Sequence, residues 1–210
     1  MMQDTEFKMQ KGVVKEVVKL PETEKEGNNF EEEMLEQILK TAALKSLIYL
    51  QFFIGRLVKV ESLSIHWTAQ QLRIGKDFVI SKIELRAKSE LAGSVYLIFP
   101  FEIAHRLTRD LYGELIPEIS RKHVLDMVEE MTNVVSVPLS ETATFFSRNT
   151  PVIPSVAHIV SYDEFKSLPL AEALALELKM DSEMKGDIYF VMEGGTVKKL
   201  KRMLKRRERE

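Results

Sequence analysis

The sequence of residues 126–133 reads Asp126-Met127-Val128-Glu129-Glu130-Met131-Thr132-Asn133. An α-helix turns by about 100° per residue, so Asp126, Glu130 and Asn133 would fall within roughly 60° of one another. The apolar residues of this segment gather on the opposite side, at Val124, Val128, Met131, Val135 and Leu139. The pattern predicts a helix that turns an apolar stripe toward a core and carries the three polar side chains outward.

The three outward side chains have two interpretations. A carboxylate and a carboxamide one turn apart can grip a cation and aim a water molecule, which is what a hydrolysis reaction needs. Polar residues opposite an apolar stripe are more often only the solvated face of a helix. Helix geometry alone leaves both interpretations open.

The spacing Asp-x-x-x-Glu-x-x-Asn resembles the signature of the CheC, CheX and FliY family of chemotaxis phosphatases, which remove the phosphoryl group from the response regulator CheY. Neighbouring segments add to the resemblance. Gly93–Pro100 is similar to the family's glycine-led strand, Ala104–Gly113 to the helix and turn that follow it, and Pro151–Pro154 to its proline-bearing segment. The resemblance covers about residues 30–204, and the single-site CheX proteins are the closer match.

The resemblance implies a protein that hydrolyses the aspartyl phosphate of a CheY-like response regulator. In the family mechanism, Asn133 would orient water for in-line attack and Glu130 would hold the active-site lysine of the receiver. Asp126 would support the interface. The receiver would bring the Mg²⁺ ion, so no cofactor is expected on this chain. The resemblance also implies a homodimer.

Two residues after the motif depart from the family pattern. The family usually has a glycine where Val137 stands. We expect Val137, together with Met127 and Val134, to form an apolar rim that contacts the partner. Pro138 would clash with the carbonyl of Val134 in a regular helix, so the helix should kink or end there. The alternative function is a non-catalytic CheC/CheX-like adaptor that binds a receiver domain or a flagellar-switch component.

An internal repeat predicts the architecture. A shift of 93 residues places Gly93 on Gly186 and Tyr96 on Tyr189, and the strand, turn and helix patterns around them recur in register. Two copies are too few for a solenoid, so the repeat predicts one pseudo-twofold duplicated domain.

The same shift carries the motif helix onto residues 33–40, where Glu33, Gln37 and Lys40 stand at the motif positions. An ammonium group only donates hydrogen bonds, so Lys40 cannot replace an asparagine that both donates and accepts. The sequence therefore predicts one active helix.

Hydrophobic periodicity and turn residues predict the other elements. Helices are expected over Phe30–Phe53, over Phe101–Tyr112 and from Ser120 onward, and strands over Val58–Trp67, Phe78–Ala87, Gly93–Phe99, Val152–Val160, Ala171–Met180 and Gly186–Met192, before a basic C-terminal helix. Short turns favour antiparallel neighbours. The predicted fold class is α+β, with an antiparallel sheet and helices packed on one side of it.

Composition limits the remaining possibilities. The 210 residues, 45% of them hydrophobic, are enough for one globular domain, predicted over residues 30–204. No apolar run is long enough to cross a bilayer and no signal-peptide core begins the chain, so we expect a cytoplasmic protein. The chain has no cysteine, its histidines lack metal-site spacing, and its net charge of −2 makes nucleic acid an unlikely partner.

The two ends differ from the middle. Residues 1–29 read as an extension and linker, and residues 205–210 as a basic tail. Within Lys11–Leu20, two valine pairs at helical spacing could form a short docking helix, or the segment could be a frayed terminus. The basic C-terminal run could attract nucleic acid or lipid, or it could be a solvated helix end.

Overall fold

The computed structural model of the chain describes residues 30–54, 60–87, 90–113, 115–146, 151–180 and 186–208. The predicted extension over residues 1–29, with its valine-rich segment, lies outside the described residues. The predicted domain end at residue 204 falls inside the last helix, which continues to Glu208.

Helices and strands follow one another along the chain close to the expected order. They are α1 (Phe30–Ile54), β1 (Val60–His66), β2 (Phe78–Ala87), β3 (Glu90–Pro100), α2 (Phe101–Tyr112), α3 (Arg121–Phe146), β4 (Val152–Pro154), β5 (His158–Val160), α4 (Tyr162–Lys166), the 3₁₀ helix η1 (Leu170–Glu172), β6 (Leu174–Met180), β7 (Asp187–Met192) and α5 (Gly194–Glu208). The α+β class is confirmed.

The described strands form one seven-stranded sheet in the order β1-β6-β7-β3-β2-β4, with β5 also paired to β2. Every pairing is antiparallel. The central strands are β3 and β7, and Leu97 lies opposite Phe190, its counterpart in the 93-residue repeat. If each strand is replaced by its repeat counterpart, the strand order read from one edge of the sheet therefore becomes the order read from the other edge. Descent from a duplicated unit stays a prediction.

Two glycines place the halves against each other. Gly93, within β3, and Gly186, immediately before β7, have φ values of 159° and 141°. A Cβ on Gly93 would lie 2.0 Å from Oγ1 of Thr196, and one on Gly186 would lie 2.9 Å from Cδ1 of Ile103. Thr196 and Ile103 are also repeat counterparts. Each half therefore packs its glycine against the first turn of the other half's helix.

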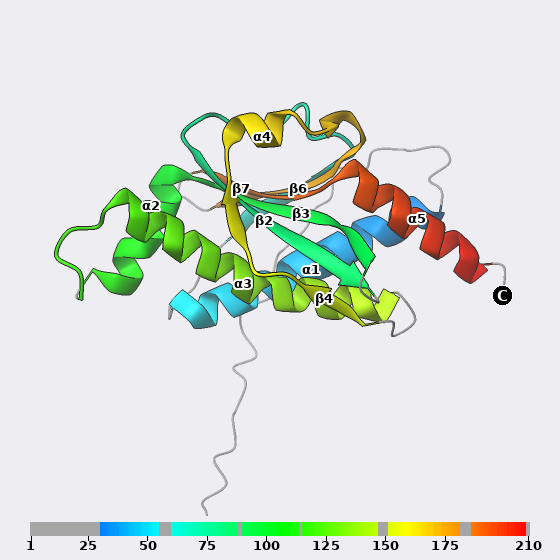
Figure 1. The fold of residues 1–210 in the computed structure, drawn as a ribbon, viewed down its shortest axis with the longest axis horizontal. Coiled ribbons are helices and arrows are strands. Elements are labelled where there is room, and N and C mark those ends of the chain that lie inside the picture. Colours follow the sequence, from blue (N-terminus) through cyan, green and yellow to red (C-terminus); the bar gives the residue numbers. More distant parts are fainter. Residues whose placement is uncertain are drawn as a thin grey trace, which may run out of the picture.

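The two faces of the sheet are covered differently. One face packs against the long helices α1, α2, α3 and α5 in the larger hydrophobic core, as predicted. The other face is covered by α4, η1 and the connection between β1 and β2, whose buried residues form a second cluster around Phe165. Figure 1 shows α4 on one side of the sheet and α1 with α3 on the other. The short α4, capped by Ser161, was not predicted.

The predicted strand Val152–Val160 is wrong as one continuous element. It is divided into β4 and β5. Between the pairs Leu85–Pro154 and Lys82–His158, β2 advances by three residues whereas the strand opposite it advances by four. The main-chain N–H of Ser155 donates to Glu84 O at 2.8 Å, and the Ser155 hydroxyl accepts from Glu84 N at 3.0 Å. This bulge keeps both halves of the strand paired with β2.

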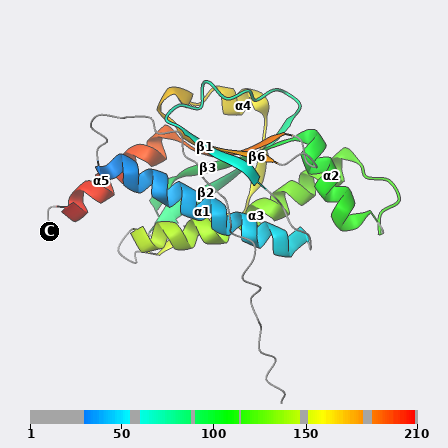
Figure 2. The ribbon, with the colours of Figure 1, turned by 180° about the vertical axis from the view of Figure 1, so that it is seen from behind.

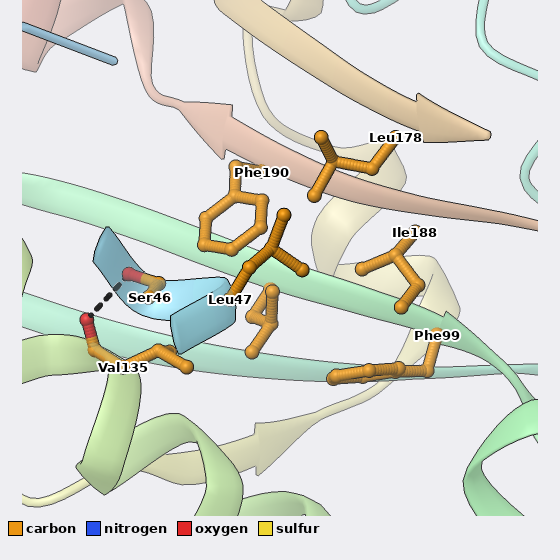
Figure 3. A pocket seen from close by; sticks show the side chains of 8 residues that line it. Ser46, Leu47, Phe99, Val135, Leu178, Ile188 and Phe190 are labelled. Atoms are coloured by element: carbon orange, nitrogen blue, oxygen red, sulfur yellow. Dashed lines mark hydrogen bonds between the residues drawn. The ribbon is translucent and has the colours of Figure 1, made fainter. Parts of the chain in front are cut away.

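Pro138 does not end α3, which continues to Phe146. The hydroxyl of Ser46 on α1 lies 3.1 Å from Val135 O, in the turn where the proline removes a backbone donor (Figure 3). Ser46 is 1% exposed, and its hydroxyl also lies 2.7 Å from Ala42 O. The apolar cavity beside it has a volume of about 10 Å³, no more than a single water needs, so it is a packing gap between the helices and the sheet.

The glycine contact gives a stability prediction. Gly93→Ala should lower the free energy of unfolding by about 1–3 kcal/mol, because the added Cβ overlaps Thr196 and the φ value disfavours an L side chain. Urea denaturation checks this. Gly195→Ala is the matched control: its added Cβ meets nothing nearer than 4.0 Å, and Gly195 lies in the helix α5, so the midpoint should not fall and should rise slightly.

Candidate functional site

The outward face of α3 carries part of the predicted motif. Asp126 and Glu130 are exposed, together with Val137 and Glu141 further along the helix. All four fall on one side of the helix at about 100° per residue. We call this row the solvent row of α3.

The predicted apolar rim is only partly present. Val137 is 42% exposed and Val134 is half-buried. Met127 is only 1% exposed and belongs to the larger core, so the prediction that it lines the docking surface is wrong. Met127 is buried because it lies about 100° around the helix from Asp126 and points into the core beneath the helix.

A second row of polar side chains on α3 faces the edge of the sheet. Its members are Glu129, Asn133, Ser140 and Thr144, which we call the edge row. Oε1 of Glu129 accepts a hydrogen bond from Ile159 N at 3.0 Å, and Oδ1 of Asn133 accepts one from Ala157 N at 2.8 Å.

The same row continues along β4. The hydroxyl of Ser140 donates to Val152 O, and Oγ1 of Thr144 accepts from Val152 N at 2.9 Å. The edge row therefore supplies hydrogen-bond partners to main-chain groups along the outer side of β4, β5 and their connection. Sheet edges left unpaired promote strand addition and aggregation, so this row stabilises the edge.

Asn133 and Glu130 therefore differ in their environment. Glu130 belongs to the solvent row and can reach a partner. Asn133 is half-buried, and its carboxamide oxygen is already bound to the main chain of the same molecule. The structure thus brings Asp126, Glu130 and Val137 together on the outside and holds Asn133 between that face and the strand edge.

Sequence reasoning missed Glu129. The signal available was a series of hydrogen-bonding side chains on one side of the helix, adjacent to the solvent row. Such a series predicts contact with backbone groups, but it does not identify which strand supplies them.

Within the described residues, the corresponding helix α1 makes a different set of contacts. Glu33 and Gln37 are exposed, and Lys40 pairs with Glu36 across 4.0 Å. Glu36, the repeat counterpart of Glu129, accepts a hydrogen bond from Nε1 of Trp67 at 2.9 Å. The first copy of the motif therefore makes helix contacts and anchors the residue that follows β1.

A separate polar cluster lies on the α4 face of the sheet. Nε2 of His66 lies 2.8 Å from Oε2 of Glu177, which joins the edge strand β1 to β6. Burial, and then the neighbouring Glu177 carboxylate, raise the pKa of Asp187. The cluster holds strands together at a position away from α1 and α3.

No group of three or more His, Asp or Glu side chains in the described residues is arranged to hold a metal ion. None of the described helices is long and apolar enough to span a membrane.

Solved structures provide the comparison with known proteins. The chain is similar to FliY from Thermotoga maritima, with 14% identity, a TM-score of 0.59, and coverage of 86% of this chain and 98% of that one. The chemotaxis protein CheX from Desulfovibrio desulfuricans matches with 14% identity, a TM-score of 0.51, and coverage of 74% and 97%. FliM in the FliG–FliM complex from H. pylori matches with 12% identity, a TM-score of 0.63, and coverage of 84% and 100%. The chain has the CheC/CheX/FliY fold.

The family resemblance drawn from the sequence is therefore confirmed as a likeness of fold. No family model matches the sequence, and neither does any curated protein. At these identities the same fold is shared by the chemotaxis protein CheX, by FliY and by FliM, so the fold does not select an activity.

The edge row predicts which motif residue stabilises the protein. Asn133→Ala and Glu129→Ala should each lower the free energy of unfolding by about 1–3 kcal/mol, because each leaves a main-chain N–H without its acceptor. Urea denaturation and amide hydrogen exchange at Ala157 and Ile159 measure this. Asn133→Asp keeps an acceptor and should lose less.

Glu130→Ala is the control in the solvent row, where substitutions typically change stability by within about 0.5 kcal/mol. Equal destabilisation by Glu130→Ala and Asn133→Ala would contradict the division into two rows.

Proposed function

We propose that this chain is a non-catalytic docking protein of the chemotaxis or flagellar-switch machinery. It would bind a CheY-like receiver or a switch component through the outward face of α1 and α3. The observation that carries the proposal is the 2.8 Å hydrogen bond from Ala157 N to the carboxamide oxygen of Asn133.

The chemistry of the motif explains why this bond matters. To orient an attacking water, the Asn133 carboxamide would have to leave the strand edge and reach into a partner's active site. That movement would leave Ala157 N without an acceptor in a half-buried place, at a cost of about 1–3 kcal/mol. Docking through Glu130 and Val137 requires no such movement.

The surface supports docking by its composition. Val137, Leu44 and Ile48 are exposed apolar side chains on α3 and α1, and the same two helices carry exposed carboxylates. An apolar centre with a charged rim is the usual composition of a protein interface. Among the similar structures, FliM is in a complex with FliG, which supports partner binding as the use of this fold.

The second candidate is phosphatase activity toward a phosphorylated CheY-like response regulator. The observation that favours it is the placement of Asp126 and Glu130 on the solvent row, with Asn133 at its border. Glu130 would hold the receiver's lysine, and Mg²⁺ would arrive with the receiver. A homodimer and a cytoplasmic location, both implied by the resemblance, belong to this proposal as well.

One experiment separates the two functions. Receiver domains from the source organism are phosphorylated, and both their binding to this chain and their loss of phosphate are followed. The docking function predicts binding with an unchanged rate of dephosphorylation. Acceleration that disappears in Asn133→Ala but persists in Lys40→Ala would establish the phosphatase instead.

The docking face gives a binding prediction. Val137→Asp should weaken binding of the receiver or switch component at least about tenfold, because a charge replaces an apolar contact at the centre of the interface. Affinity is measured by titration calorimetry. The matched control is Ile153→Asp on β4, where an equally apolar side chain is 65% exposed outside this face, and where no change in affinity is expected.

A further inference from the structure

β1 is an edge strand that pairs, within the described residues, with β6 alone (Figure 2). The opposite edge of the sheet is held by the edge row of α3, whose side chains bond to main-chain groups of β4 and β5. On α1 the equivalent glutamate, Glu36, instead binds Nε1 of Trp67, beyond the end of β1. The side-chain links that join β1 to its neighbour therefore run across the sheet itself.

Two pairs of charged side chains in the described residues connect β1 to β6. Nζ of Lys179 lies 3.2 Å from Oε2 of Glu61, and both side chains are mostly exposed, so water and salt screen this pair. Nε2 of His66 lies 2.8 Å from Oε2 of Glu177, and these side chains are only 28% and 27% exposed. The inner pair, His66 with Glu177, is the better protected of the two links.

Glu177 is the centre of a polar network on the α4 face of the sheet. It lies opposite Tyr189 of β7, and Asp187 precedes Tyr189 by two residues, on the same face. The Tyr189 hydroxyl and the Asp187 carboxyl both lie next to the Glu177 carboxylate. Burial and the two carboxylates raise the pKa of Tyr189, so its hydroxyl keeps its hydrogen and can donate it to one carboxyl at a time. Glu177 thus binds His66 while it competes with Asp187 for the tyrosine.

The other half of the sheet carries the same glutamate in different surroundings. Glu84, the repeat counterpart of Glu177, lies 3.2 Å from Nζ of Lys82 and 3.3 Å from Nη2 of Arg86. These two cations hold the pKa of Glu84 below its usual value. A serine stands there at the position of Asp187. The second half therefore replaces a neutral neighbour by a second carboxyl, next to the glutamate that binds β1.

Asp187 is the member of the network whose protonation the surroundings favour. Burial raises its pKa and the Glu177 carboxylate raises it further, whereas Lys179 lowers it. The folded state therefore holds this proton more tightly than the unfolded chain does. The sign follows: protonation of Asp187 stabilises the fold as the pH falls through the raised value, and the stabilisation is absent at higher pH.

We propose that His66, Glu177 and Asp187 form a pH-sensitive clamp on the edge strand β1. In mildly acidic solution Asp187 donates a hydrogen bond to Glu177, and the imidazole of His66, which then carries a charge, binds the same carboxylate from β1. At higher pH Asp187 is ionised and repels Glu177, so β1 is held less firmly. The strength with which this edge is attached follows the pH of the solution.

Amide hydrogen exchange of the full chain tests the clamp at about pH 7.5 and about pH 5.5, with each rate corrected for intrinsic exchange. The protection factors of residues 62–66 should rise about fivefold at the lower pH, as expected when a hydrogen bond becomes charge-assisted. Residues 95–99 of β3 report opening of the whole molecule and should rise less. Unchanged protection of β1, or an equal rise in β3, would overturn the proposal.

Two variants separate the roles of the members. Asp187→Asn can donate at every pH, so the protection of β1 at the higher pH should already approach the acid value and the rise should shrink. His66→Ala removes the link between the strands and should lose the rise. Asp126→Asn, which changes an exposed aspartate on α3, is the matched control and should keep the rise of the wild type. A full rise in either network variant would contradict the clamp.

A measurement on the wild type does not depend on whether the variants fold. The ¹³C carboxyl signals of Asp187 and Glu177 and the ring signals of His66 should shift over a common pH range, because interacting groups titrate together. Signals that move independently of one another would also overturn the proposal.

Discussion

The antiparallel pairing of β3 with β7 is the interaction on which the rest of the structure depends. It joins the strand groups β1-β6-β7 and β3-β2-β4, each of which contains strands from both halves of the chain, and it places Leu97 opposite Phe190 at the centre of the sheet. Because side chains alternate along a strand, this register sends Leu97 and Phe190 to the face of the long helices and Tyr96 and Tyr189 to the face of α4. A slip of one residue would exchange these two cores.

The register also determines where α1 and α3 lie. Gly93 and Gly186 bring the first turns of α5 and α2 close to the opposite halves, and the two long helices then cover the centre of the same face. Packed there, α3 presents one row of side chains to the edge formed by β4 and β5. The position of the motif is thus a consequence of how the sheet is assembled, and its polar residues are divided between stabilising an edge and facing solvent.

Local sequence predicted the elements whose limits are set by local chemistry. The bounds of β2 and α2 are as expected, since alternating residues define the strand and Pro100 immediately precedes the helix. The division of Val152–Val160 could not be predicted, because it depends on Ser155 meeting Glu84 on another strand. The outward placement of Glu130 followed from helical periodicity, whereas the contact of Asn133 with Ala157 depends on tertiary packing.

The asymmetry between the repeat helices bears on how the motif should be interpreted. An asparagine accepts with its oxygen and donates with its nitrogen, whereas a lysine only donates. At position 133 the oxygen is needed by Ala157 N, so the fold itself gives a reason for an acceptor there. At position 40 the lysine instead pairs with Glu36, and within the described residues β1 pairs with β6 alone. The asparagine at position 133 is therefore explained by its hydrogen bond to the sheet edge. Its presence in the sequence is not sufficient evidence for catalysis.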